Sequence, residues 1–299
     1  MKKLKGIIVP MVTPLNEDNS IDFAATDKLV EHLYRGGVHG IFVLGTTGEA
    51  QSLSFAQRKE FIIYVGKLLG GRLPYIAGIS DTSYEDALEL ASAAEQSGAC
   101  GVVSTVPYYF EPSQREIENW YRKLADNSAL PVYIYNMPSH VKASIAPETV
   151  AALASHPNIR GFKDSSHNMT YFQTVSYLTR GESDFSLFVG PEEQTAQAVL
   201  MGAAGGVNGG ANMFPELYVG MYEAALSGNL DRVRLLQASI MEISSKVYSV
   251  GGYLPGLKCA MEYMGICKRW LSSVYSSMSE EGVEKMKKCL AGIAVSDWK

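Results

Sequence analysis

Gly40-Ile41-Phe42-Val43-Leu44 begins the stretch that decides the fold class, and this stretch continues through the range 55–69 to Tyr75-Ile76-Ala77-Gly78. The first and last segments are apolar throughout, which is typical of strands buried on both faces of a sheet. Within 55–69, apolar residues recur at helical spacing, which predicts an amphipathic helix. Because strands joined by a helical crossover run parallel, the three segments predict one β-α-β unit.

The same unit recurs along the chain. Short runs rich in β-branched residues predict eight strands, at residues 7–9, 40–44, 75–78, 101–104, 132–135, 159–163, 186–189 and 205–208. Amphipathic periodicity predicts helices between them, among them 24–34, 55–69, 84–96 and 114–125. Eight β-α repeats match the α/β class of fold known as the (β/α)8 or TIM barrel. The alternative is a doubly wound open sheet, but the first strand lacks the glycine-rich dinucleotide turn that such a sheet normally carries.

The end of the chain differs from the repeats. It has strong helical periodicity, and no linker rich in Pro, Gly or Ser separates it from the preceding residues. We therefore predict a barrel over residues 1–225 and a C-terminal helical extension, residues 226–299, packed on the barrel.

Composition excludes several classes of function. The 299 residues are 46% hydrophobic and carry 26 Lys and Arg against 31 Asp and Glu, for a net charge of -5. No basic surface for a phosphate backbone is indicated, so nucleic acid is not an expected partner. The sequence has no run of about 18 apolar residues, so no membrane span is predicted. The four cysteines form no C-x-x-C pair, so we expect no metal site and a reducing, cytoplasmic location.

The candidate nucleophile is Lys163, which ends the sixth predicted strand. Reactive groups of barrel enzymes project from the carboxyl ends of the strands. Burial disfavours the charged form of a lysine, and a neutral amine can attack a carbonyl to form a Schiff base. The alternative is a lysine paired with a neighbouring carboxylate at the barrel rim.

Tyr135 ends the fifth predicted strand. Alternation along a strand puts Tyr133 and Tyr135 on the same side of the sheet. If that side is the barrel interior, Tyr135 lies near the mouth, beside the strand that carries Lys163, where a phenol can transfer protons. The alternative is a packed tyrosine whose hydroxyl is bonded to the backbone.

Glycine-rich turns follow two other strands. After the second strand, Gly45-Thr46-Thr47-Gly48-Glu49 can present backbone N–H groups that bind a carboxylate or a phosphate. After the eighth, Gly205-Gly206-Val207-Asn208-Gly209-Gly210 is either a phosphate-binding loop or a place where backbones approach closely.

Four motifs together resemble the dihydrodipicolinate synthase and N-acetylneuraminate lyase family. They are Gly45-Thr46-Thr47-Gly48-Glu49, Tyr108-Tyr109, Tyr135-Asn136-Met137-Pro138 and Gly161-Phe162-Lys163-Asp164. The resemblance spans essentially the whole chain. It implies a class I aldolase mechanism, in which pyruvate is the donor or the product and a covalent lysine imine carries the chemistry without a metal or another cofactor.

The resemblance also implies roles for individual residues. Lys163 forms the Schiff base, Tyr135 is the general acid and base, and Thr46 and Tyr109 complete a proton relay. In the family, the tyrosine that matches Tyr109 is typically contributed by the neighbouring subunit, and tetramers built from tight dimers are common. A homotetramer is therefore expected here.

Substrate-binding residues follow from the same resemblance. The N–H groups of Thr46 and Thr47 are expected to hold the pyruvate carboxylate. The carbonyl of Val207 and the region of Gly190 are expected to line the site.

His140 departs from the family pattern. Synthases that condense pyruvate with aspartate semialdehyde usually carry an arginine at this position, where it binds the carboxylate of the second substrate. Histidine is shorter and cannot form a bidentate pair with a carboxylate, although Lys142 could substitute for the arginine.

These observations predict a pyruvate-dependent aldolase that cleaves or forms a 2-keto-3-deoxy sugar acid, with an aldehyde as the second partner and His140 among its binding residues. Dihydrodipicolinate synthase is the nearest alternative. N-acetylneuraminate lyase is less favoured because that branch commonly has Ser-Thr in place of Thr46-Thr47. A non-catalytic binding protein on the same fold has no need of a proton relay.

Overall fold

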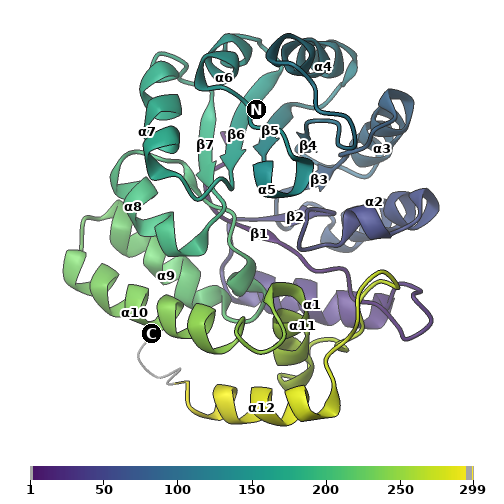
Figure 1. The fold of residues 1–299 in the computed structure, drawn as a ribbon, viewed down its shortest axis with the longest axis vertical. Coiled ribbons are helices and arrows are strands. Elements are labelled where there is room, and N and C mark those ends of the chain that lie inside the picture. The colour runs from purple at the N-terminus through teal and green to yellow at the C-terminus, as the bar shows by residue number, and fades with distance from the viewer. Residues whose placement is uncertain (1–2, 294–297, 299) are drawn as a thin grey trace.

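Eight parallel strands form a closed barrel in the computed structural model, which describes residues 3–293 and Trp298 (Figure 1). They pair in sequence order, and the last pairs with the first. The strands are β1 Gly6–Pro10, β2 Gly40–Val43, β3 Tyr75–Gly78, β4 Gly101–Thr105, β5 Val132–Asn136, β6 Ile159–Asp164, β7 Ser186–Val189 and β8 Gly205–Gly206. The predicted (β/α)8 barrel is therefore confirmed.

Helices surround the strands, and further helices follow the barrel (Figure 1). Around the barrel lie α1 Phe23–Arg35, α2 Phe55–Leu69, α3 Tyr84–Gln96, α4 Gln114–Asn127, the short α5 Pro138–Val141, α6 Pro147–Ala154, α7 Met169–Leu178, α8 Thr195–Leu200 and α9 Pro215–Leu226. The C-terminal part consists of α10 Leu230–Lys246, α11 Tyr253–Tyr263 and α12 Glu280–Ala291. The boundary that we propose after residue 225 falls at the end of α9.

Local sequence explains where the helices begin. The carboxylate of Asp22 accepts a hydrogen bond from the N–H of Ala25 and so caps α1. Ser54 and Ser113 begin α2 and α4 with complete capping boxes. Each cap satisfies backbone donors that a helix leaves unpaired in its first turn.

The barrel interior is a separate apolar layer, distinct from the layer between strands and helices. Its members come from alternate strand positions and include Ile8, Phe42, Val103, Tyr133 and Tyr135. The intervening strand residues face the helices and pack in the larger core. Alternation puts both tyrosines of β5 on one side of the sheet, as the sequence predicts, and the structure shows that this side is the barrel interior.

Strand β8 is shorter than predicted because the chain turns away from the sheet after Val207. It enters a single 3-10 turn, Gly209–Asn212, where the side chain of Asn212 accepts from the N–H of Val12 at 3.1 Å and donates to the carbonyl of Pro10 at 3.0 Å. An amide side chain thus replaces the β-ladder between β8 and β1 at the carboxyl end of the barrel.

The C-terminal part is fastened to the barrel by a buried ion pair. The Nζ of Lys258 on α11 lies 2.5 Å from a carboxylate oxygen of Glu49, in the loop after β2, and both side chains are fully buried. Lys258 also donates to the carbonyl of Trp270 at 2.8 Å, and Glu49 accepts from the N–H of Ser272 at 2.8 Å. A single acidic side chain from the barrel therefore holds both α11 and the segment after it.

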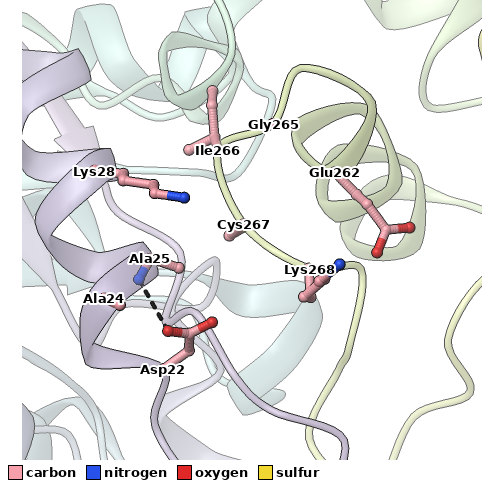
Figure 2. Close-up of a pocket in the computed structure, with 9 residues that line it drawn as sticks. All are labelled: Asp22, Ala24, Ala25, Lys28, Glu262, Gly265, Ile266, Cys267 and Lys268. Atoms are coloured by element: carbon pink, nitrogen blue, oxygen red, sulfur yellow. Dashed lines mark hydrogen bonds between the residues drawn. The ribbon is translucent and has the colours of Figure 1, made fainter.

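A small pocket of about 200 Å³ lies between the same segment and α1. Figure 2 shows its walls, which are the loop Gly265–Lys268 after α11 on one side and Asp22, Ala24, Ala25 and Lys28 on the other. In Figure 1, α12 lies at the edge of the molecule, beyond α11, against which it packs. In the described part of the chain, no helix is long and apolar enough to cross a membrane.

We expect Lys258→Met to lower the free energy of unfolding by about 3–5 kcal/mol, because the substitution leaves the charge of Glu49 buried without its partner. Urea unfolding measures the loss. The double variant Glu49→Gln/Lys258→Met should recover much of it, since no uncompensated charge remains. Equal losses in the single and double variants would contradict this account.

Candidate active site

Lys163 and Tyr135 lie side by side at the carboxyl end of the barrel. They are direct partners in the register between β6 and β5, so both side chains face the interior. The Nζ of Lys163 lies 3.8 Å from the centroid of the Tyr135 ring and 5.7 Å from that of Phe42. Among the described residues, no carboxylate lies within ion-pair distance of this nitrogen. The alternative of a lysine paired at the rim therefore has no support in the geometry.

The hydroxyl of Tyr135 lies 3.2 Å from Oγ1 of Thr46. Burial works to raise the pKa of this phenol, but the charge of Lys163 and hydrogen bonds from Thr46, Lys163 and Ser165 outweigh it, so the pKa is lowered. A phenol with a lowered pKa exchanges its proton more readily near neutral pH, which suits a general acid and base.

The loop after β2 presents free backbone donors. The N–H groups of Thr46 and Thr47 make no hydrogen bond with any described residue. The side chain of Thr47 is held by the hydroxyl of Tyr253, 3.0 Å away. A pair of unpaired N–H groups at a strand end can bind a carboxylate.

Backbone strain is concentrated near this end of the barrel. Of the six non-glycine residues with positive φ among those described, five follow the carboxyl ends of strands. They are Leu44, Glu49, Tyr109, Lys142 and His167. Such conformations cost free energy and cluster at sites where side chains must take a fixed direction.

One cavity of about 560 Å³ opens at the carboxyl end of the barrel, and most of the predicted site residues line it. Seven of them line it: Thr46, Thr47, Tyr135, His140, Lys163, Gly190 and Val207. An adjoining cavity of about 230 Å³ shares Thr46, Tyr135 and His140 with it. Residues from β2, β5, β6, β7 and β8 thus meet around the amine of Lys163.

Tyr109 is the predicted site residue that the fold leaves outside this group. Its side chain is 88% exposed, and its ring packs edge-on against that of Phe110, itself 82% exposed. It lines neither cavity. The aromatic pair instead projects into solvent from the loop after β4.

The C-terminal part contributes residues to the cavity wall that the sequence analysis missed. Tyr248 and Tyr253 line the cavity beside Glu192. The carboxylate of Glu192 accepts hydrogen bonds from Tyr248, Tyr218 and the N–H of Gly210. Burial raises the pKa of Glu192 to about 7, so this carboxylate titrates near physiological pH. Periodicity gave no signal for the two tyrosines, because they come from outside the repeating units.

Close backbone approach explains the glycine-rich loop after β8. A Cβ on Gly209 would lie 1.7 Å from the hydroxyl oxygen of Tyr253, and one on Gly210 would lie 1.9 Å from that of Tyr218. The N–H of Gly210 is already bonded to Glu192. The loop packs against buried phenols, which favours close approach over phosphate binding.

His140 lies at the rim of both cavities. Partial burial, the larger cause, and repulsion from the charge of Lys163, the smaller one, lower the pKa of His140. The imidazole is therefore neutral at pH 7. Its Nδ1 lies 3.0 Å from the hydroxyl of Ser139. Lys142 is solvent-exposed and lines neither cavity, so it does not take the place of an arginine.

A buried amine beside a phenol of lowered pKa, at the mouth of a (β/α)8 barrel, is the arrangement that an aldolase of class I needs, because this class works through a lysine imine. Comparison with known sequences identifies the family. The chain belongs to the Dihydrodipicolinate synthetase family, which it matches over residues 3–293. Members of this family are pyruvate-dependent lyases and synthases that form a Schiff base on lysine, and their substrates are pyruvate with aldehydes or keto acids.

Relatives within the family carry three different activities. The chain is 47% identical to a dihydrodipicolinate synthase of Bacteroides thetaiotaomicron, covering 97% of this chain and 99% of that one with a TM-score of 0.94. It is 34% identical to an N-acetylneuraminate lyase of Rhizobium meliloti, over 88% of this chain and 87% of that protein. It is 31% identical to a probable 2-dehydro-3-deoxy-D-pentonate aldolase of Escherichia coli K12, over 89% of each chain.

We expect Tyr135→Phe to reduce turnover by about 10²- to 10⁴-fold, the usual loss when a general acid and base is removed. Steady-state kinetics with pyruvate and an aldehyde measures the effect. Tyr133→Phe is the matched control, because Tyr133 lies on the same strand and in the same interior layer but does not line the cavity. Equal rates for the two variants would remove Tyr135 from the chemistry.

Proposed function

We propose that the protein is a pyruvate-dependent aldolase that cleaves or forms a 2-keto-3-deoxy sugar acid. The observation that carries this proposal is the charge of the cavity wall. Among the described lining residues, Lys163 is the one lysine, and there is no arginine. A second substrate with its own carboxylate binds most strongly to a cationic side chain such as arginine, whereas a hydroxylated aldehyde is matched by neutral donors and acceptors such as His140 and Ser139.

The reaction begins with imine formation on Lys163. In the direction of synthesis, its neutral amine attacks C2 of pyruvate, and the resulting carbinolamine loses water to give a protonated imine. The pyruvate carboxylate binds the free N–H groups of Thr46 and Thr47. The carbonyl of Val207 and the backbone at Gly190 form the opposite wall of the pyruvate site. The covalent imine supplies the electron sink, so no metal or other cofactor is required.

Carbon–carbon bond formation then uses Tyr135. The oxygen of Tyr135, which gave its proton to the departing water when the imine formed, takes a proton from the pyruvate methyl group and so converts the protonated imine into an enamine. The enamine carbon attacks the aldehyde carbon, and the new alkoxide takes a proton from the phenol of Tyr135. Water hydrolyses the imine and releases the 2-keto-3-deoxy acid together with the free amine of Lys163. Cleavage follows the same steps in reverse.

We propose that Tyr109 completes the proton relay in an assembled homotetramer, a dimer of dimers. Its exposure and that of Phe110 support this, because aromatic residues that project from a surface are typical of protein interfaces. In this assembly, Tyr109 of one subunit reaches the Thr46 and Tyr135 of its neighbour. Sedimentation velocity tests the assembly, and a monomer at enzyme concentrations used in assays would reject it.

We also propose a cytoplasmic location and neither nucleic acid nor membrane as a partner.

Dihydrodipicolinate synthase is the second candidate. The 47% identity with the Bacteroides thetaiotaomicron synthase favours it, while His140 and the scarcity of cations in the cavity wall oppose it. N-acetylneuraminate lyase and a non-catalytic binding protein have weaker support, the latter because Lys163, Tyr135 and Thr46 occur together.

Pyruvate followed by borohydride should leave a stable pyruvyl adduct on Lys163, because borohydride reduces the imine to an amine that water cannot hydrolyse. Intact mass and peptide mapping locate the adduct. Lys163→Ala is the control and should remain unlabelled. An adduct on another lysine, or none at all, would falsify the proposed mechanism.

Turnover with aspartate semialdehyde should be weak, and His140→Arg should raise kcat/KM for this substrate by about tenfold or more, since a charge-assisted hydrogen bond is worth about 1.5–3 kcal/mol. A coupled assay measures both values. Efficient synthase activity in the unaltered enzyme would reject the choice of a sugar acid and favour the second candidate.

A further inference from the structure

Tyr275 is a residue of the C-terminal part with no assigned role. It lies in the segment between α11 and α12. Its side chain is 49% exposed and lines both the 560 Å³ cavity and the adjoining 230 Å³ cavity. Its hydroxyl makes no hydrogen bond with any described residue. A free phenol therefore stands at the mouth of the candidate active site.

The segment that carries Tyr275 is held firmly. The N–H of Tyr275 donates to the carbonyl of Ser272 at 2.8 Å, and the N–H of Ser272 donates to Glu49 at 2.8 Å. The N–H of Ser273 donates to the side chain of Asn19 at 3.1 Å. Glu49 is the carboxylate of the buried ion pair and lies in the same loop as Thr46. Tyr275 is thus tied, through Glu49, to the loop that presents the carboxylate-binding N–H groups.

Five residues line both cavities: Thr46, Tyr135, Met137, His140 and Tyr275. Tyr135 lies against the amine of Lys163, whereas His140 and Tyr275 are exposed to solvent. A molecule that is bonded to Lys163 and extends past Tyr135 toward solvent therefore meets His140 and Tyr275. A phenol both donates and accepts hydrogen bonds, so it matches an alcohol group better than a carboxylate or an alkyl chain.

We propose that Tyr275 is a specificity-determining residue that binds a hydroxyl group of the second substrate. This inference rests on the proposed function and deepens it. It names a residue outside the barrel as the one that binds the polyhydroxylated end of the acceptor aldehyde. Tyr275 does not take part in imine formation, which occurs at the floor of the cavity.

Tyr275→Phe tests the proposal, because it removes the hydroxyl and keeps the ring. With saturating pyruvate, kcat/KM is measured for D-glyceraldehyde and for propanal, which lacks the hydroxyl groups. The ratio of the two values should be well above one in the unaltered enzyme and fall about three- to tenfold in Tyr275→Phe, as expected for one neutral hydrogen bond. The KM for pyruvate should not change. Tyr263→Phe is the matched control, since Tyr263 is 52% exposed on α11 and lines neither cavity.

The outcomes separate this inference from the proposed function. An unchanged ratio, an equal loss for both aldehydes, or the same change in Tyr263→Phe overturns the role of Tyr275, as does a ratio near one in the unaltered enzyme. If those results accompany a normal pyruvyl adduct on Lys163, the imine mechanism stands and the inference alone fails. Absence of the adduct rejects the proposed function itself, and an enzyme that forms the adduct but accepts neither aldehyde rejects both the sugar-acid proposal and the inference.

Discussion

The pairing register between β5 and β6 is the constraint on which the site depends. It sets Tyr135 directly beside Lys163, and closure of the barrel directs both side chains into the barrel interior, at the floor of the cavity. A shift of one residue in either strand would send one of these side chains toward the helices, because side chains alternate along a strand. The next pair shows this alternation, since Asn136 and Asp164 point outward and bond to each other at 2.8 Å.

The C-terminal helices contribute contacts that hold residues of the site in place. Through Tyr253 they fix the side chain of Thr47, and through Tyr248 they hold the buried carboxylate of Glu192. The ion pair of Lys258 with Glu49 fastens α11 to the loop after β2, which also carries Thr47. Strained backbone near the strand ends is tolerated because the packed barrel and the added helices hold those loops in place.

Much of the fold could be predicted because each strand and helix leaves a local periodic signal. The positions of Lys163 and Tyr135 followed from the same signal, since a strand end in a barrel has a known direction. The expected roles of Thr46, Val207 and Gly190 came from resemblance to a family and not from pattern. Tyr248, Tyr253 and Tyr275 escaped prediction for a physical reason: long-range packing brings them to the mouth, and no spacing in the sequence records it. Glu192 escaped prediction as well, because the burial of a carboxylate is not visible in the sequence.

The dependence of the cavity on Tyr253 and Tyr275 has a consequence for synthesis of the chain. A ribosome adds residues from the N-terminus, and domains fold as they emerge. When all eight strands have left the ribosome, the barrel can close around Lys163, but the residues that secure Thr47 and flank the mouth have not yet been made. The residues that complete the pocket therefore emerge after Lys163 and after every strand that surrounds it.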